Sequence, residues 1–199
     1  TFPYNRNDDA PTNPVEKVEN YDFYKSAHIL LGNVEADYKI HGFEDLHLHA
    51  NIAGEYSTGG EYNTNNPQST YGFYYGGNSE NKEKKYNVVA TAYAQYTKDF
   101  NKANHFDIMA GYEWQHFWRS KNNDYVGYYP STNNDASLAG TERPHTPYSE
   151  KSESYLVSFF GRANYTLLDR YFLTATVRDD GSSRFKEHWA WFPSFAFAW

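Results

Sequence analysis

The sequence contains no cysteine among its 199 residues. A disulfide framework and thiolate metal sites are therefore excluded, although the absence of cysteine does not identify a compartment. No run approaches the roughly 18 consecutive apolar residues that a membrane-spanning helix needs, so a helical membrane protein is excluded as well. A transmembrane β-barrel is not excluded, because its strands alternate between apolar and polar residues and look polar on average.

Clusters of basic residues are also lacking. The 18 Lys and Arg residues are scattered and the formal net charge is -7, so no electrostatic footprint for nucleic acid is visible. The first residues, TFPYNRNDDAPTNPVEK, do not show the basic-then-apolar order of a secretory signal. We therefore expect that a signal has been removed or that the chain begins inside a larger protein.

Aromatic residues, in contrast, are abundant. The chain has 20 Tyr, 14 Phe and 5 Trp, yet its mean hydropathy is -0.88, which is strongly polar. This mixture suits strands with two different faces, or a surface that binds a ligand.

The stretch LHLHANIAGEY (46–56) alternates between apolar and polar residues. Leu48 and Ile52 fall on one side of an extended strand, and His49 and Glu55 fall on the other. A period of two predicts a β-strand with one apolar and one polar face. Six more segments alternate in this way: 27–40, 86–99, 105–118, 154–167, 171–180 and 191–199. We predict an all-β antiparallel meander of about seven strands, and helical periodicity competes nowhere.

The predicted connections alternate in length. Short turns follow Ile40, Asp99 and Leu168, whereas Ser57 to Lys85 and Arg119 to Glu153 are predicted to be long polar loops. Short turns at one end and long loops at the other are typical of outer-membrane barrels. Each strand is also about as long as the roughly 9 to 11 residues that cross a bilayer at a tilt.

An antiparallel β-sandwich would alternate too, so a soluble, secreted carbohydrate-binding sandwich is the alternative interpretation. Three features favour lipid. The apolar face mixes Ala and Gly with Tyr or Trp near its ends, and it carries almost no charge in mid-strand. The other face carries charges that suit a wet lumen: Glu35, Asp37, Glu55, Glu113 and Arg162.

The two interpretations predict different surroundings for the same side chains. A barrel wall is an open, curved sheet with Ile52, Ile108 and Leu173 exposed on its convex face. Glu55, Glu113 and Arg178 would then lie on the concave face. Burial of the first set between two sheets would favour the sandwich.

The last third, FFGRANYTLLDRYFLTATVRDDGSSRFKEHWAWFPSFAFAW, carries a dense motif. It resembles the late-barrel region of the SusC/RagA family of TonB-dependent outer-membrane transporters. The matching residues are Phe160, Gly161, Arg162, Asn164, Tyr165, Tyr171, Leu173, Thr174, Ala175, Val177, Arg178, Asp180, Gly181, Ser182, Ser183, Arg184, Phe185, Trp191, Phe192, Pro193, Ser194 and Trp199. Lys186, Glu187 and His188 depart from the family pattern, which affects only loop detail.

This resemblance implies part of a barrel of about 22 strands with a plugged lumen. Seven strands cannot close such a barrel, so residues 1–199 are expected to be a fragment of its wall. The plug, the segment that engages TonB and the closing strands would then be absent. In isolation the fragment would expose two unpaired edges and a bare lipid face, and it should aggregate.

The resemblance also implies a function. Family members import large nutrients, such as oligosaccharides or peptides, through the outer membrane of Gram-negative bacteria. A SusD-like surface lipoprotein acts as their lid, and TonB supplies the energy. Outer-membrane lipid is a further expected partner, and no cofactor is expected.

Tyrosine-rich segments of the predicted loops are the candidate ligand-binding residues. Aromatic faces stack on sugar rings and Tyr hydroxyl groups form hydrogen bonds, which suits glycan contact. The alternative is that these side chains pack the loops against one another or against the lid protein. The candidates are Tyr71, Phe73, Tyr74, Tyr75, Tyr125, Tyr128 and Tyr129.

The sequence gives little support for a metal site, a calcium site or a catalytic site. His47 and His49 have the spacing of a metal pair and His41 lies nearby, but no third ligand is identifiable, so we expect ordinary histidines and no metal site. The segment DDGSSRF (179–185) lacks the calcium-loop pattern and is predicted to be a tight extracellular turn held by Asp–Arg pairing. No catalytic Ser/His/Asp order or phosphate-binding glycine loop is present, so an enzyme is not expected.

Overall fold

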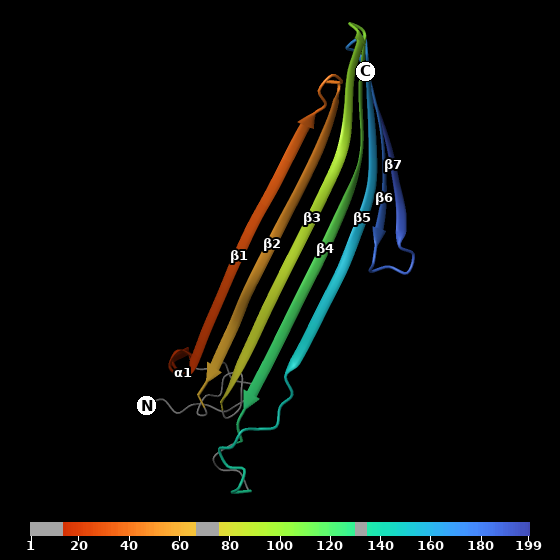
Figure 1. Ribbon diagram of the computed structural model, residues 1–199. Helices are drawn as coiled ribbons and strands as arrows, with labels where there is room; N and C mark the ends of the chain where they lie inside the picture. Colours follow the sequence, from red (N-terminus) through yellow and green to blue (C-terminus); the bar gives the residue numbers. More distant parts are fainter. Residues whose placement is uncertain (1–13, 67–75, 130–134) are drawn as a thin grey trace. The chain divides into compact units, whose positions relative to one another are not determined.

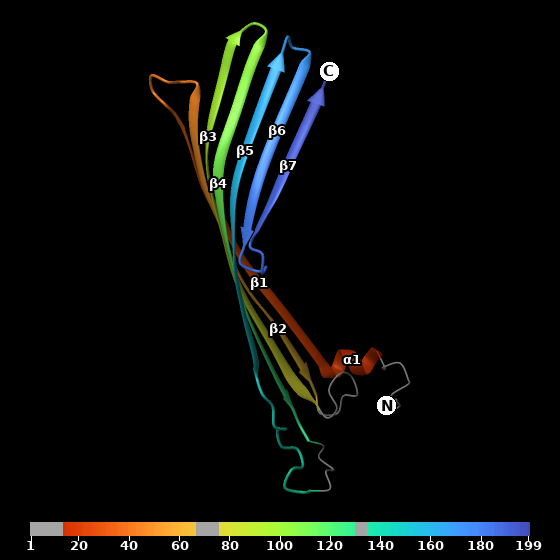
Figure 2. The ribbon, with the colours of Figure 1, turned by 90° about the vertical axis from the view of Figure 1, so that its right-hand side faces the viewer.

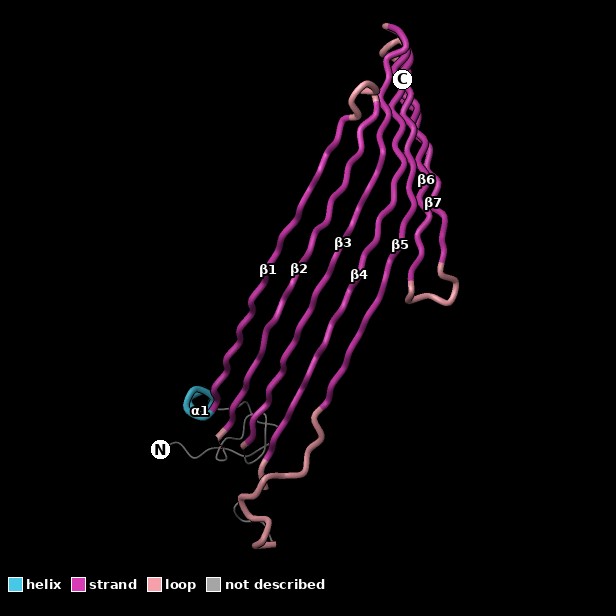
Figure 3. The backbone as a smooth tube through the Cα atoms, viewed as in Figure 1, coloured by secondary structure: helices cyan, strands magenta, loops and turns pink. Residues whose placement is uncertain are grey.

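The computed structural model describes residues 14–66, 76–129 and 135–199, and β-strands dominate it (Figures 1 and 3). The seven predicted strands are confirmed and form one sheet, in which each strand pairs with its neighbours in the sequence. They are β1 (Tyr21–Lys39), β2 (Leu46–Asn65), β3 (Gly77–Asn101), β4 (Asn104–Gly127), β5 (Tyr148–Leu167), β6 (Tyr171–Ser182) and β7 (Trp189–Ala198).

One short helix, α1 (Pro14–Asn20), precedes β1 (Figure 2). This helix was not predicted, because seven residues are too few to show helical periodicity. Pro14 suits the first helical position, where no backbone N–H is needed, and Lys17 lies in the last turn, near the negative end of the helix dipole. Among the described residues, no helix is long and apolar enough to cross a membrane.

The long strands extend well beyond the predicted ones. β3 and β4 have 25 and 24 residues, and β2 and β5 have 20 each. The predicted loop boundaries are therefore wrong. β2 continues to Asn65 and β3 begins at Gly77, within the predicted loop from Ser57 to Lys85. Likewise, β4 continues to Gly127 and β5 begins at Tyr148.

The chain forms two compact units. We call the first the outer-half unit, because it contains the long connections. It consists of the described residues of Thr1–Ile29, Ser57–Lys85 and Arg119–Lys151. The wall unit contains Leu30–Tyr56, Tyr86–Trp118 and Ser152–Trp199. The wall unit carries the alternating segments of the sequence, as well as all of β6 and β7.

A tight turn joins β5 to β6. Leu168 and Asp169 have positive φ angles of 56° and 55°, and the N–H of Arg170 donates to the carbonyl oxygen of Leu167 at 3.1 Å. Two central residues with positive φ define a type I′ turn, whose twist matches that of paired strands. Three residues, 168–170, separate the paired positions Leu167 and Tyr171, so the register of the hairpin places Ala163 opposite Ala175.

The DDGSSRF segment differs from its prediction. Asp180 does pair with an arginine, Arg178, at 2.7 Å, but both residues belong to β6 rather than to a turn. The chain turns only after Ser182, whose N–H donates to the carbonyl oxygen of His188 at 2.8 Å. Backbone pairing therefore closes this connection, and the ion pair lies within the strand.

β7 is an edge strand whose only partner in the described sheet is β6. It contains Pro193, which lies opposite Val177. Proline lacks an N–H, so the backbone of β7 donates no hydrogen bond at this position. Every residue of β7 is exposed.

Candidate functional site: the two faces of the wall unit

The side chains predicted for the apolar face are exposed. Ile52, Ile108 and Leu173 have 60%, 41% and 51% of their surface accessible. No hydrophobic residue is buried in the described part of the chain. A sandwich requires an apolar core between two packed sheets. The sandwich alternative is therefore wrong, since this chain forms one sheet without such a core.

Polar side chains of the other face are joined by hydrogen bonds. Asp107 on β4 accepts hydrogen bonds from Gln95 and Thr97 on β3 and from Asn164 on β5. The bonds from Thr97 and Asn164 measure 3.0 Å each, and Arg162 Nη2 lies 3.8 Å from the same carboxylate. The carboxylate therefore connects three adjacent strands on one polar surface.

Arg178 organises a second polar network. Its Nη2 donates to Glu113 Oε1 at 2.8 Å and to Ser158 Oγ at 2.9 Å, and its Nε donates to Asp180 Oδ1 at 2.7 Å. These partners come from β4, β5 and β6, so one guanidinium group crosslinks three strands. The predicted polar residues Glu113 and Arg178 thus share a face and contact each other.

The histidines of β2 pair with acidic residues of β1. The Nδ1 atoms of His47 and His49 lie 3.4 Å from different carboxylate oxygens of Asp37, and His49 Nε2 lies 3.7 Å from Glu35 Oε1. The ring of His49 also stacks on Tyr93 with 4.6 Å between centroids. In the described ranges no group of three or more His, Cys, Asp or Glu residues is arranged to hold a metal ion.

Gly111 allows large rings to lie close to the strands. A Cβ atom at this position would lie 2.5 Å from Phe160 Cζ and from Tyr93 Cβ, and 2.8 Å from the carbonyl oxygen of Ala92. Tyr93 and Phe160 approach each other edge-on, with 6.5 Å between centroids. This role of Gly111 was not predicted, because the alternation within one strand does not show which residues of other strands approach it.

Aromatic rings gather on the apolar face where the wall unit ends toward the long connections. Tyr86 stacks on Trp118 with 4.5 Å between centroids, and His116 stacks on Tyr155 at the same separation. His116 Nε2 lies 2.8 Å from Glu153 Oε1, so this row also has polar groups. Such amphipathic rings suit the boundary between lipid and water.

A second aromatic row lies toward the short turns. Phe43 stacks on Tyr96 at 5.7 Å, and Phe106 contacts Tyr165 at 4.9 Å between centroids. Tyr155 and Tyr165 stand ten positions apart on β5. At about 3.3 Å per residue and a tilt of about 40°, ten residues span about 25 Å, the height of the apolar band of an outer-membrane barrel.

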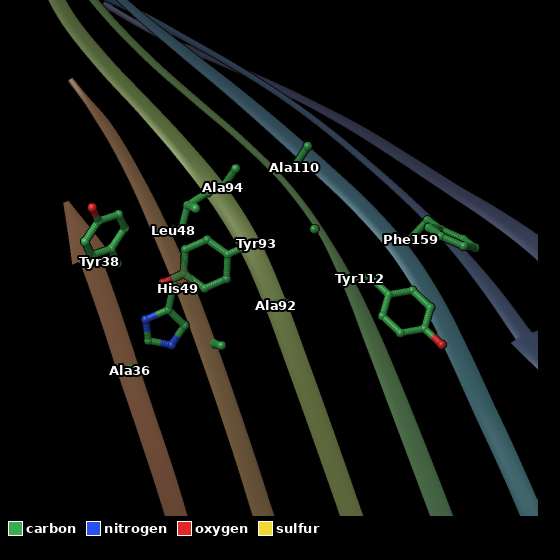
Figure 4. A pocket seen from close by; sticks show the side chains of 12 residues that line it. Ala36, Tyr38, Leu48, His49, Ala92, Tyr93, Ala94, Ala110, Tyr112 and Phe159 are labelled. Carbon is green, nitrogen blue, oxygen red and sulfur yellow. The ribbon is translucent and has the colours of Figure 1, made fainter. Parts of the chain in front are cut away.

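Between these rows, small side chains leave a shallow apolar hollow of about 640 Å³ on the wall unit (Figure 4). Alanines of β1, β3 and β4 line it, including Ala36, Ala92 and Ala110. Tyr38 and Phe159 also line it, from β1 and β5. The small residues that the sequence placed at the middle of the apolar face are thus confirmed there.

The candidate ligand-binding residues of the first predicted loop cannot be placed, because Tyr71, Phe73, Tyr74 and Tyr75 lie outside the described residues. Their ligand contact stays a prediction.

The second candidate segment is described. Tyr125 belongs to β4, so its assignment to a loop is wrong. Tyr128 forms an isolated bridge with Glu142. The guanidinium of Arg143 lies 5.6 Å from the ring centroid of Tyr129, whose N–H donates to the carbonyl oxygen of Thr141 at 2.9 Å. Tyr128 and Tyr129 therefore contact the returning chain, as the packing alternative expects, while their ligand contact stays untested.

Comparison with known proteins agrees with this geometry. No family model matches the sequence. The TonB-dependent receptor SusC of Bacteroides thetaiotaomicron is 42% identical over 200 residues, which cover 98% of this chain and 19% of SusC. The TonB-dependent receptor P3 of Formosa agariphila is 35% identical over 118 residues, which cover 57% of this chain and 12% of that receptor.

Among solved structures, the RagAB peptide transporter matches with a TM-score of 0.74 at 22% sequence identity, over 92% of this chain and 21% of the matched chain. The RagAB peptide importer in its 'closed-closed' state matches with a TM-score of 0.70 at 20% identity. The fold is that of a segment of a TonB-dependent receptor barrel. The resemblance to the SusC/RagA family is confirmed, since SusC matches along nearly the whole chain. The chain spans about a fifth of the length of SusC and of the matched RagAB chain.

Proposed function

We propose that this chain is part of the barrel wall of a SusC-like transporter that imports large nutrients, such as oligosaccharides or peptides, across the outer membrane of a Gram-negative bacterium. One observation carries the proposal: an exposed apolar band lies between two aromatic rows, and hydrogen-bonded polar networks occupy the opposite face. This arrangement suits a wall with lipid on one side and a wet lumen on the other. The named relatives are receptors and a transporter, which supports transport rather than catalysis.

In this proposal, residues 1–199 form one segment of the barrel domain. The plug, the TonB-engaging segment and the strands that close the barrel lie outside it. The edges of β1 and β7 would pair with neighbouring strands, which would satisfy their free backbone groups. A SusD-like surface lipoprotein would cover the outer mouth, and TonB would supply energy from the inner membrane.

Uptake by whole cells tests the proposal. Cells with and without the receptor that contains this segment would be given fluorescent oligosaccharides and fluorescent peptides, in the presence and absence of a protonophore. We expect uptake of at least one cargo class to require both the receptor and the proton gradient. Equal uptake by cells that lack the receptor, for every cargo, would show the proposal to be wrong.

A further inference from the structure

The outer-half unit contains a polar hollow of about 550 Å³, formed on β1 to β4. This volume falls within the range of about 300 to 1,000 Å³ that is usual for small-ligand sites. None of the candidate binding residues from the sequence lines it. It is therefore a separate surface from the tyrosine-rich segments.

Two adjacent glycines of β2, Gly59 and Gly60, are among the residues that line the hollow. A Cβ atom on Gly59 would lie 2.8 Å from the carbonyl oxygen of Ser26, so a side chain does not fit there without backbone movement. Gly60 has more room, because its nearest neighbour would be the carbonyl oxygen of Asn81 at 3.5 Å. The bare backbone of β2 at these positions leaves space that side chains fill elsewhere.

Positive charge dominates the lining. Lys25, Lys82, Lys85 and Lys121 line the hollow, against only Glu61 and Glu83. This excess is local, since the whole chain has a net charge of -7.

The ion pairs do not use up this charge. Lys82 Nζ lies 2.8 Å from Glu80, which pairs its charge outside the hollow. Lys25 Nζ lies 3.6 Å from Glu61, which is a long pair, and Glu83 is shared between Lys85, at 3.2 Å, and Arg119. Lys121 has no ion-pair partner in the ranges that the structure describes. The hollow therefore offers cationic donors to an anionic group.

Asn81 adds a hydrogen-bond acceptor to the lining of the hollow. Its amide oxygen is buried and accepts no hydrogen bond from any described residue. A buried acceptor without a donor costs free energy, which the Asn81 side chain would recover by turning its oxygen into the hollow, toward a ligand hydroxyl group. Asn123 places a second amide in the same lining. A ligand that fits would carry both negative charge and hydroxyl donors.

We propose that this hollow binds an acidic oligosaccharide, with its carboxylate or sulfate groups at Lys25 and Lys121 and its hydroxyl groups at Asn81. The inference rests on the proposed function of nutrient import, and it specifies the class of cargo. Lysine side chains attract such groups most strongly at low salt, so binding should weaken as ionic strength rises.

Calorimetry on the full-length receptor in detergent tests the inference. The probes are tetragalacturonate and a chondroitin sulfate tetrasaccharide, with maltotetraose as the neutral match and tetraglutamate as the peptide match. We expect the acidic sugars to bind, and the Lys25→Gln/Lys121→Gln double variant to lose about tenfold in affinity.

Lys84→Gln is the matched control, because Lys84 precedes Lys85 on β3 but does not line the hollow. It should bind like the parent receptor. Unchanged binding by the double variant would overturn the inference, as would equal, lysine-dependent binding of tetraglutamate. A receptor that still imports cargo but has no acidic-sugar site overturns only this inference, whereas a receptor that imports nothing overturns the proposed function.

Discussion

Arg178 of β6 donates a 2.8 Å hydrogen bond to Glu113 of β4 and thereby spans the intervening β5. Ser158 of β5 accepts from the same guanidinium nitrogen at 2.9 Å. A slip of one residue in any of these strands would turn its side chain to the other face. The interaction therefore fixes the register of three strands on the polar face, in addition to the backbone pairing.

Replacing Arg178 by Met should destabilise the wall. Glu113 would keep hydrogen bonds only from Gln115 and Thr91, and its charge would lose its cationic partner. We expect a loss of about 1.5 to 3 kcal/mol, the usual range for hydrogen bonds to charged groups. Urea unfolding of the whole receptor in micelles measures it. Arg184→Met is the control, because Arg184 has no ion pair among the described residues, and equal midpoints for the two variants would contradict the prediction.

An arginine on the apolar band should destabilise the receptor. An arginine at the next position, on the polar face, should be tolerated. Ala92 lies between the aromatic positions Tyr86 and Tyr96 on β3, and Thr91 points toward Glu113 at 3.4 Å. Ala92→Arg should cost about 2 to 4 kcal/mol, the usual penalty near the middle of a bilayer. The folded fraction recovered in lipid vesicles, compared between Ala92→Arg and Thr91→Arg, tests this. Equal recovery would mean that the apolar face does not contact lipid.

Gly111→Ala should destabilise the wall more than the same change at Gly32. The new methyl group at Gly111 would overlap Tyr93 and Phe160, whereas nothing lies within 4 Å of a Cβ at Gly32. Overpacking of this kind costs about 1 to 3 kcal/mol. The difference in urea midpoint between the two variants measures it, and a more stable Gly111→Ala receptor would show that the rings move aside freely.

Two substitutions in the β5–β6 turn should stabilise the receptor. Leu168 and Asp169 hold positive φ angles, which cost a non-glycine residue roughly 1 to 2 kcal/mol. Asn and Gly are the residues preferred at these positions of a type I′ turn. The double change Leu168→Asn/Asp169→Gly should raise the thermal midpoint of the receptor. Leu167→Asn, one residue earlier in the strand, should not raise it, and the same gain there would rule out turn geometry as the cause.

Acid should weaken the outer-half unit through Glu83. Burial raises the pKa of Glu83, but hydrogen bonds from Arg119 and Lys85 outweigh it and hold the pKa below its usual value. The stabilisation is therefore present above the ordinary pKa of about 4.3, and it is lost as pH falls through the lower, folded value. The protection factors of the backbone amides of residues 81–85, which correct for the intrinsic pH dependence of exchange, should fall below that pH in the parent receptor. The Glu83→Gln variant should have low protection factors for these amides at every pH. A variant whose protection changes with pH as in the parent would contradict this.

The sequence predicted the wall unit well, because one face of each strand is apolar and the other is polar, so successive residues differ in character. Segments such as 46–56 and 86–97 alternate for that reason, and they are strands. The outer halves of the same strands were predicted as loops. In GGEYNTN (59–65) and GNSENKEKK (77–85) both faces are polar, so pairing continues without any alternation to reveal it.

The polar networks could be predicted only in part. Alternation placed Glu113 and Arg178 on the same kind of face, but 65 positions separate them in the chain. Whether they meet depends on the register of three strands, which turn geometry sets. The polar hollow could not be predicted for the same reason. Lys25 and Lys121 both line it only because β2 and β3 pair in the right register between their strands.

The strand order β1 to β7 follows the chain without a single crossover. Each new pairing therefore closes only the loop between consecutive strands, which keeps the entropy of each closure small. Such a sheet can lengthen by one strand at a time, with the last strand added serving as the template for the next. A chain organised in this way can enter a bilayer progressively, because the next strand to pair is always the next segment of the sequence.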